Sequence, residues 1–140
     1  MNHPIYSCLW FDAEAKAAAQ FYCSVFKNGK IISENQFVVI FEINNTKFMA
    51  LNGGPEYKFT EAISLVVDCD TQEEIDYYWN ILTDGGKEGK CGWLKDKYGL
   101  SWQIVPKILG KLMSDPEKAP RVMYAFMQMK KFDIEKLLKA

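Results

Sequence analysis

The chain has 140 residues and a mass of 16.1 kDa, a length that matches one ordinary domain with a hydrophobic core. Its apolar fraction of 49% and charged fraction of 25% are those of a globular protein, which excludes disorder over most of the chain. The 17 Lys and Arg residues against 18 Asp and Glu give a formal net charge of -1, so no long-range field favours nucleic acid or an anionic membrane as a partner.

The first part of the chain predicts a strand, a helix and a hairpin. The apolar run from Ile5 to Phe11 has the length of a strand, and Asp12 is a candidate N-cap for an Ala-rich helix over residues 13–26. Two runs rich in β-formers follow, at 36–43 and 46–51. The Asn44-Asn45 pair between them is a strong hairpin signal.

From Ala62 the same order of elements begins again. Residues 62–68 (AISLVVD) are typical of a buried strand, and Thr71 followed by Glu74 is the capping pattern of a helix that reaches Leu82. Residues 89–95 and 100–105 are two further expected strands. The turn Asp96-Lys97-Tyr98-Gly99 joins them.

The two halves match position by position. Leu9 and Leu65, Asp12 and Asp68, and the aromatic pairs Phe21-Tyr22 and Tyr77-Tyr78 are each 56 residues apart, and Phe48 and Trp102 are 54 apart. Matching turns as well as apolar positions favour a true repeat, although two strand-helix units can also resemble each other by chance. We therefore expect one domain over 1–140, with a first module at about 4–55 and a second at about 60–107.

The tail, residues 108–140, predicts helices. Asp115-Pro116-Glu117 places a proline in the first turn of one of them, and a short terminal helix is expected after Asp133. An apolar stripe accompanies the first, made of Val122, Met123, Phe126, Met127 and Met129. A Met-rich stripe faces a core or a partner more often than a cofactor.

The N-terminus and the cysteines predict the compartment. Met1-Asn2-His3-Pro4 lacks a basic region followed by an apolar run, and no stretch approaches the roughly 20 apolar residues of a membrane helix. We expect a cytoplasmic protein. The four cysteines (Cys8, Cys23, Cys69 and Cys91) are widely spaced and expected to be reduced thiols, because a reactive one would need a nearby base and His3 is the single histidine.

Three segments carry a family resemblance. They are LWFDAEAKAAAQFYCSVF at 9–26, KFMALNGGPEYKF at 47–59 and CGWLKDKYGLSWQIVP at 91–106. They resemble the PhnB-like branch of the vicinal oxygen chelate superfamily, which also contains glyoxalase I, bleomycin-resistance proteins and extradiol dioxygenases. The resemblance implies an α+β fold of paired βαβββ modules whose sheets curl into a cup, usually completed in a homodimer.

Members of this branch are often labelled 3-demethylubiquinone-9 3-methyltransferase. A methyltransferase of the Rossmann-like type needs a Gly-rich turn after its first strand and a long parallel sheet. This sequence has Asp12-Ala13-Glu14-Ala15 after the first strand, and no alternating series of βα units. The sequence therefore disfavours methyltransferase activity.

Metal-dependent members of the superfamily hold a divalent ion with inward-facing His or Glu side chains. By the resemblance, the Gly-x-x-x-Glu motif of the last strand corresponds to Gly99 and Gln103, so an amide stands in place of the carboxylate. Strand alternation and the two offsets place Tyr6, Met49 and Ala62 at the other three positions. These four side chains do not make a divalent-metal site, so we expect neither a metal nor another cofactor. His3 is expected to be solvated.

What remains is a cup with a predicted lining of Tyr6, Trp10, Met49, Ser64, Trp93 and Gln103. Aromatic and apolar surface with a few polar groups is typical of a small-molecule pocket, although such aromatics also fill cores. A Gln103 amide in this setting is expected to find a hydrogen-bond partner.

The leading hypothesis is a binding protein for an unknown, mainly apolar or aromatic small molecule. Two alternatives stay open. One is a metal-independent enzyme in which Glu42, Glu61 or Lys95 acts as acid or base. The other is a dimerisation module without a ligand.

Overall fold

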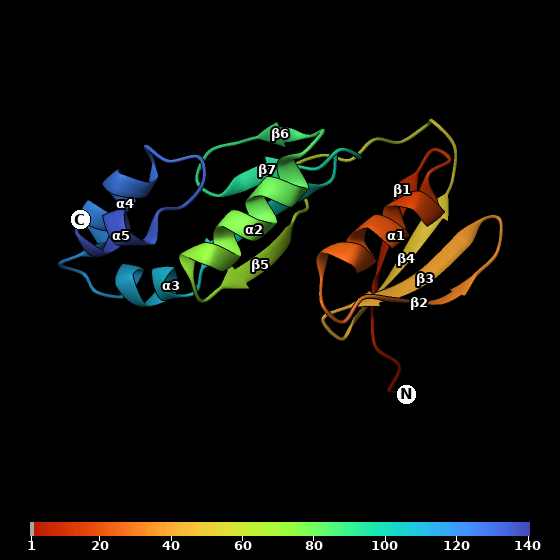
Figure 1. Ribbon diagram of the computed structural model, residues 1–140, viewed down its shortest axis with the longest axis horizontal. Coiled ribbons are helices and arrows are strands. Elements are labelled where there is room, and N and C mark those ends of the chain that lie inside the picture. The colour runs from red at the N-terminus through yellow and green to blue at the C-terminus, as the bar shows by residue number, and fades with distance from the viewer. Residues whose placement is uncertain (1) are drawn as a thin grey trace. The chain divides into compact units, whose positions relative to one another are not determined.

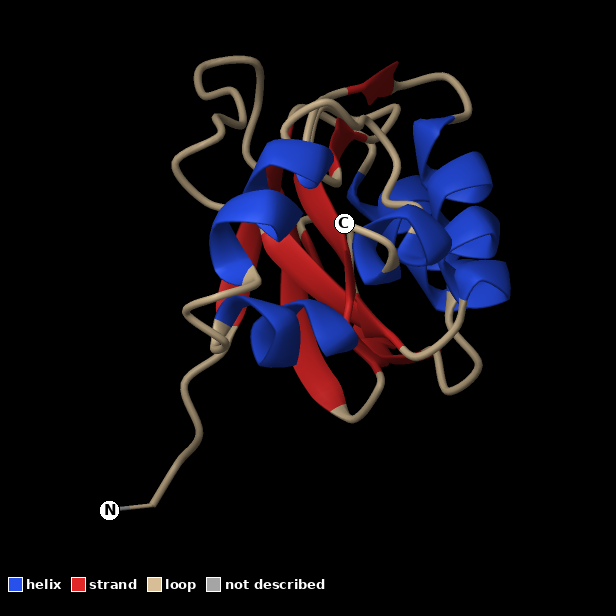
Figure 2. Ribbon diagram, turned by 90° about the vertical axis from the view of Figure 1, so that its left-hand side faces the viewer, coloured by secondary structure: helices blue, strands red, loops and turns tan. Residues whose placement is uncertain are grey.

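The computed structural model describes residues 2–140 and divides into two compact units, Met1–Phe59 and Thr60–Ala140, which are described in turn (Figure 1). Each predicted module falls within one unit, and the tail belongs to the second. Residues 2–6 form an extended loop before the first strand (Figure 2). Among residues 2–140, no helix has the length and apolar character needed to cross a bilayer.

The first unit is a four-stranded mixed sheet with one helix. Its elements are β1 (Ser7–Phe11), α1 (Ala15–Val25), β2 (Lys30–Glu34), β3 (Val38–Ile43) and β4 (Thr46–Asn52). The strand order is β1-β4-β3-β2, in which β1 and β4 run parallel and the other neighbours antiparallel. The predicted hairpin is confirmed: Asn44 and Asn45 both have positive φ, 48° and 62°, as a tight turn between twisted strands requires.

The helix α1 buries an alanine-rich face. Ala15, Ala18 and Ala19 are fully buried, which allows the helix backbone to approach the sheet closely. The predicted Asp12 cap is wrong, because the helix begins at Ala15 and its Glu14 N-cap position makes no side-chain capping bond. Instead, the Asn52 side chain at the end of β4 accepts a hydrogen bond from the Ala15 amide at 2.8 Å.

The second unit repeats this arrangement. Its elements are β5 (Leu65–Cys69), α2 (Gln72–Thr83), β6 (Lys87–Glu88), β7 (Trp93–Lys95) and β8 (Ser101–Pro106). The strand order is β5-β8-β7-β6, and β5 and β8 form the parallel pair. The two units therefore share one topology, βαβββ, as the sequence predicts. The Thr71 cap of α2 is also confirmed, since its hydroxyl accepts from the Glu74 amide at 3.2 Å.

A buried carboxylate organises the turn between β7 and β8. Asp96 is 2% exposed, and its oxygens accept hydrogen bonds from the Tyr98 amide at 2.8 Å and the Leu100 amide at 3.1 Å. They also accept from the indole of Trp102 at 2.9 Å, which fixes that ring in the core. Gly99 closes the turn with a φ of +87°, a conformation that favours glycine.

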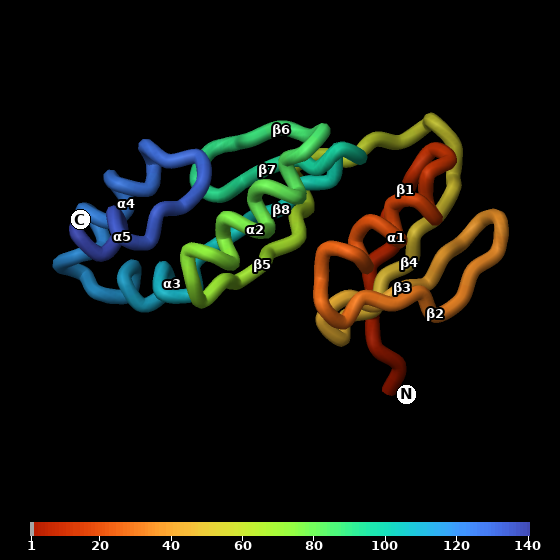
Figure 3. Tube along the Cα trace, viewed as in Figure 1, coloured from red at the N-terminus to blue at the C-terminus, as the bar shows by residue number. Residues whose placement is uncertain are grey.

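The tail consists of three short helices, α3 (Ile108–Met113), α4 (Ala119–Phe126) and α5 (Ile134–Leu138). Their path at the end of the chain can be followed in Figure 3. The helix predicted at Asp115 begins later, because Asp115 first forms a turn by accepting from the Glu117 amide at 2.9 Å. Gln72 of α2 forms two hydrogen bonds with the tail. Its side-chain amide donates to the Phe132 carbonyl at 2.9 Å and accepts from the Ile134 amide at 2.8 Å.

The strand registers correct the predicted repeat offset. In the parallel pairs, Ser7 lies opposite Phe48 and Leu65 lies opposite Trp102. Since Phe48 and Trp102 are structurally equivalent, Ser7 corresponds to Leu65, which is 58 residues away and not 56. The buried residues agree, because Leu9 and Phe11 of β1 match Val67 and Cys69 of β5. The structural counterpart of Tyr6 is therefore Ser64, and Ala62 lies in the turn before β5.

Candidate functional site

Each sheet has one face covered by its helix and one face turned away from it. In the first unit Leu9, Phe41 and Phe48 are buried on the α1 side. In the second unit Val67 and Trp102 are buried on the α2 side. The residues between them in each strand point to the other face, which we call the open face of that sheet. Trp10, Met49, Trp93 and Gln103 lie at strand positions of this kind, and Tyr6 and Ser64 continue the alternation just before β1 and β5. The six predicted lining residues therefore fall on the open faces, three in each unit.

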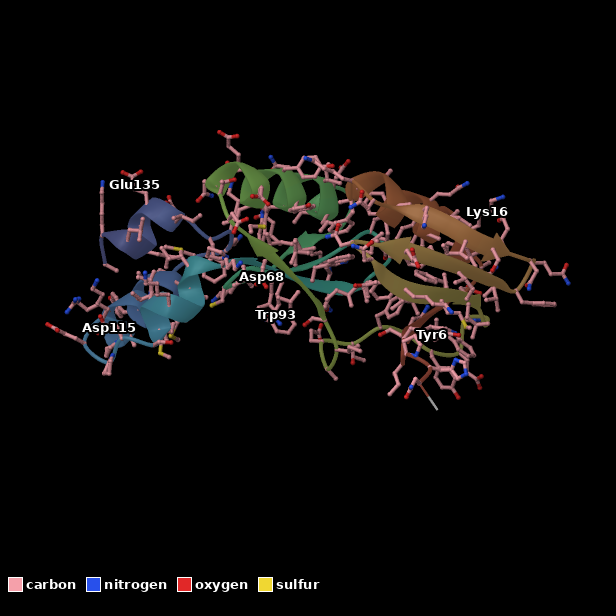
Figure 4. The ribbon with its side chains drawn as sticks, turned by 90° about the horizontal axis from the view of Figure 1, so that it is seen from below. Tyr6, Lys16, Asp68, Trp93, Asp115 and Glu135 are labelled. Carbon is pink, nitrogen blue, oxygen red and sulfur yellow. The ribbon has the colours of Figure 1, made fainter. Side chains whose placement is uncertain are left out.

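In the first unit the open face carries Tyr6, Met49 and Trp10. Tyr6, just before β1, is 40% exposed, and the Lys47 ammonium lies 4.2 Å from the centroid of its ring. Met49 is half-buried and lies opposite Cys8 in the register of β1 and β4. Figure 4 shows Tyr6 on the side of the sheet away from α1.

Trp10 is held by the loop that follows β4. Its indole nitrogen donates to the Gly54 carbonyl at 2.9 Å, and the Tyr57 ring meets it edge-on with centroids 4.9 Å apart. A side chain at Gly53 would lie 2.3 Å from the indole, so only glycine permits this approach. Trp10 thus packs against the loop that follows β4, and this contact reduces the surface that the Trp10 ring offers to a ligand.

In the second unit Ser64, Trp93 and Gln103 lie close together. The Gln103 amide nitrogen donates to the Ser64 hydroxyl at 3.0 Å, which confirms that the amide has a hydrogen-bond partner. Trp93 of β7 lies directly opposite Gln103 of β8 in the antiparallel register. Figure 4 shows Trp93 on the side away from α2. Half-buried polar and aromatic groups are therefore adjacent on this face.

The donor set in each unit does not fit a catalytic divalent metal. The positions predicted to correspond to the superfamily's metal ligands, with Ser64 in place of Ala62 by the observed register, hold a phenol and a thioether in the first unit, Tyr6 and Met49, and a hydroxyl and an amide in the second, Ser64 and Gln103. Mn²⁺, Zn²⁺ and similar ions prefer carboxylate, imidazole or thiolate ligands, of which these positions offer none. Within residues 2–140, no three His, Cys, Asp or Glu side chains come together as a metal-ligand cluster.

The charged candidates for acid-base chemistry are engaged in surface ion pairs. Glu42 lies 3.7 Å from the Lys30 ammonium, and Glu61 pairs with Lys95. The hydrogen bond from Lys95 lowers the pKa of Glu61 below its ordinary value. A carboxyl group that transfers protons near neutral pH usually needs a raised pKa. The shift at Glu61 has the opposite direction.

Burial keeps three of the four cysteines protonated. All four cysteines are free thiols, as the sequence predicts. Burial raises the pKa of the Cys69 thiol to about 12, and burial also raises the pKa values of Cys8 and Cys23. Raised values keep these thiols protonated and weakly nucleophilic. His3 is exposed in the loop before β1.

Comparison with known proteins identifies the family. The family described as 3-demethylubiquinone-9 3-methyltransferase matches residues 3–105. The solved structure of a PhnB protein from Bacillus cereus, described as a 3-demethylubiquinone-9 3-methyltransferase, is 30% identical. It covers 74% of this chain and 99% of its own, with a TM-score of 0.68. This chain belongs to that family, within the vicinal oxygen chelate superfamily. No curated protein matches the chain.

Two more distant structures share the fold of this PhnB-like chain. A protein from Pseudomonas aeruginosa is 16% identical over 75% of this chain and 98% of its own, with a TM-score of 0.64. The fosfomycin resistance protein FosX from Listeria monocytogenes, solved with Mn(II) and sulfate, is 12% identical over 81% of this chain and 97% of its own, with a TM-score of 0.59. The predicted α+β fold of glyoxalase and bleomycin-resistance type, with added C-terminal helices, is confirmed.

The architecture of this PhnB-like chain differs from that of a Rossmann-like methyltransferase, although the family's descriptive name refers to a methyltransferase. Each sheet of the PhnB-like chain contains one parallel strand pair, and the remaining pairs are antiparallel. The segment between β1 and α1 contains no glycine. A Rossmann-like methyltransferase binds its cofactor at a Gly-rich turn of a parallel sheet, so the fold supplies no such cofactor site at this position.

Proposed function

We propose that this PhnB-like protein binds a small, mainly apolar or aromatic molecule on the open face of its second sheet, without a catalytic metal. The hydrogen bond between Gln103 and Ser64 carries the proposal. It supports binding because the amide and the hydroxyl occupy superfamily ligand positions and together offer donors and acceptors beside the Trp93 ring. Tyr6, Trp10 and Met49 in the first unit remain predicted lining residues.

A thermal-shift screen of metabolites and divalent metals tests this function. A ligand that binds only the folded state raises the melting temperature by mass action. We expect a metabolite to stabilise the wild type, and Gln103→Leu to weaken its binding by roughly tenfold, because about one hydrogen bond is lost. Gln20→Leu, at an exposed position on α1, is the matched control and is expected to bind normally.

Three outcomes of the screen would contradict the proposal. The first is that no metabolite stabilises the protein. The second is a metabolite whose effect is the same for the wild type and Gln103→Leu. The third is saturable stabilisation by one equivalent of Mn²⁺, Ni²⁺ or Zn²⁺, because neither the amide and hydroxyl in the second unit nor the phenol and thioether in the first should retain such an ion. In the described residues, no feature favours the metal-independent enzyme over a binding protein.

We also propose that the protein is a two-fold homodimer. The strands β1 and β5 are edge strands of their sheets, and exposed apolar side chains lie at both: Ile5 is 101% exposed, Ile63 56% and Val66 57%. Exposed edges with apolar side chains favour pairing with a second copy. Light scattering at micromolar concentration should give twice the chain mass of 16.1 kDa. A monomer at that concentration would show that these edges stay unpaired.

The cytoplasmic location stays a prediction.

A further inference from the structure

A small pocket lies on the open face of the second sheet, next to Trp93. It has a volume of about 270 Å³ and extends from β6 to the start of β8. Trp93, Lys95, Lys87, Glu61 and Ser101 contribute to its walls. This volume is below the range of pockets for drug-sized molecules, so it suits a small ligand.

Ser101 is an unusual component of this pocket. Ser101 is 1% exposed, yet its hydroxyl oxygen has no hydrogen-bond partner, and it is the sole buried side-chain nitrogen or oxygen among residues 2–140 in this condition. The register of β7 and β8 places Ser101 opposite Lys95, on the same face as Trp93. Buried hydroxyl groups in folded proteins are almost always hydrogen-bonded. Because Ser101 lines the pocket, a ligand bound there would supply the partner that its buried hydroxyl lacks.

Two basic and two acidic side chains line the pocket, Lys87, Lys95, Glu61 and Glu88. Glu88 accepts a hydrogen bond from the Trp79 indole at 3.0 Å and lies 4.0 Å from the Lys130 ammonium. Lys95 pairs with Glu61, and both side chains are partly exposed, at 41% and 60%. Lys87 lies opposite Lys95 in the register of β6 and β7, and within the described residues its ammonium makes no ion pair. Lys87 is thus the one charged side chain of the lining without an ion pair among residues 2–140, and the Lys95–Glu61 pair is a partly exposed contact of little energetic weight. The Lys87 ammonium therefore favours an acidic ligand.

We propose that this pocket binds a small carboxylic acid with a flat apolar body. The carboxylate accepts a hydrogen bond from the Ser101 hydroxyl and lies near the ammonium groups of Lys87 and Lys95, while the apolar body packs against the Trp93 ring. This assignment rests on the proposed small-molecule function and specifies the chemical class of the ligand that binds to the open face of the second sheet. Trp93 was predicted from the sequence as a lining residue, whereas Ser101 and Lys87 were not, because their significance depends on burial and strand pairing.

Titration with benzoate and with benzyl alcohol tests the proposal. The two probes have similar shape, but only benzoate carries a negative charge. We expect benzoate to bind saturably at millimolar concentrations and benzyl alcohol to bind much more weakly. Ser101→Ala should weaken benzoate binding roughly tenfold, since it removes one hydrogen bond to a charged group. Lys87→Met should weaken it several-fold, and Lys111→Met, an exposed position on α3, should not.

The stability of the ligand-free variant separates a binding role of Ser101 from a structural one. Because the hydroxyl has no partner, Ser101→Ala should fold normally, with a melting temperature equal to or above that of the wild type. Equal benzoate binding by the wild type and Ser101→Ala, equal binding of both probes, or no saturation at millimolar benzoate would overturn the pocket assignment. If the metabolite screen still finds a ligand that depends on Gln103, the proposed function survives and only this assignment fails.

Discussion

Replacing Asp96 with alanine is expected to lower the free energy of unfolding by roughly 3 kcal/mol or more, because it leaves several buried donors without an acceptor. The Asp96 carboxylate is 2% exposed and accepts from the Trp102 indole and from the amides of Tyr98 and Leu100. Water cannot easily replace it at this site. Urea denaturation monitored by tryptophan fluorescence measures the loss.

Asp115→Ala is the matched control for this experiment. Asp115 also accepts hydrogen bonds from two backbone amides, those of Glu117 at 2.9 Å and Lys118 at 3.3 Å, but these bonds are exposed. Water can satisfy the amides after the substitution, so a loss of about 1 kcal/mol is expected. Equal effects of the two substitutions would show that burial of the Asp96 carboxylate does not determine its contribution.

Phe41→Ala is expected to destabilise the first unit by roughly 3–5 kcal/mol, the usual cost of removing a buried phenylalanine ring. Phe41 is 0% exposed and stacks on Phe48, with ring centroids 5.5 Å apart, and on Tyr22 at 6.1 Å. The substitution removes both contacts and leaves a cavity under α1. Denaturant midpoints from far-UV circular dichroism measure the change.

Phe37→Ala tests whether position rather than residue type determines this loss. Phe37 precedes β3 and is 59% exposed, so its ring contributes little buried surface. Its backbone amide and carbonyl bonds, to Asn35 and Asn52, do not depend on the side chain. A change within about 0.5 kcal/mol is expected. A loss as large as that of Phe41→Ala would mean that the exposed ring is covered in solution, as it would be at a dimer interface.

The sequence by itself determined the features that depend on neighbours a few residues apart. The Asn44-Asn45 hairpin, the Thr71 cap of α2 and the short helix after Asp133 are all present in the structure. Each depends on local interactions: the hairpin on two adjacent residues with positive φ, and the starts of α2 and α5 on a side-chain oxygen that accepts from an amide three residues later. The strand β2 (Lys30–Glu34) was missed because it is mostly exposed and lacks an apolar alternation.

The tertiary structure alone decided features that join distant parts of the chain. The cap of α1 comes from Asn52, 37 residues after the amide that it accepts from, so the nearby Asp12 was a misleading local signal. The repeat offset in β5 is 58 rather than the predicted 56. Alternation could not detect this difference, because a shift of two residues leaves every side chain on the same face. The pairing of Gln103 with Ser64 and the unpaired Ser101 hydroxyl both follow from that register and from burial, which local sequence patterns do not encode.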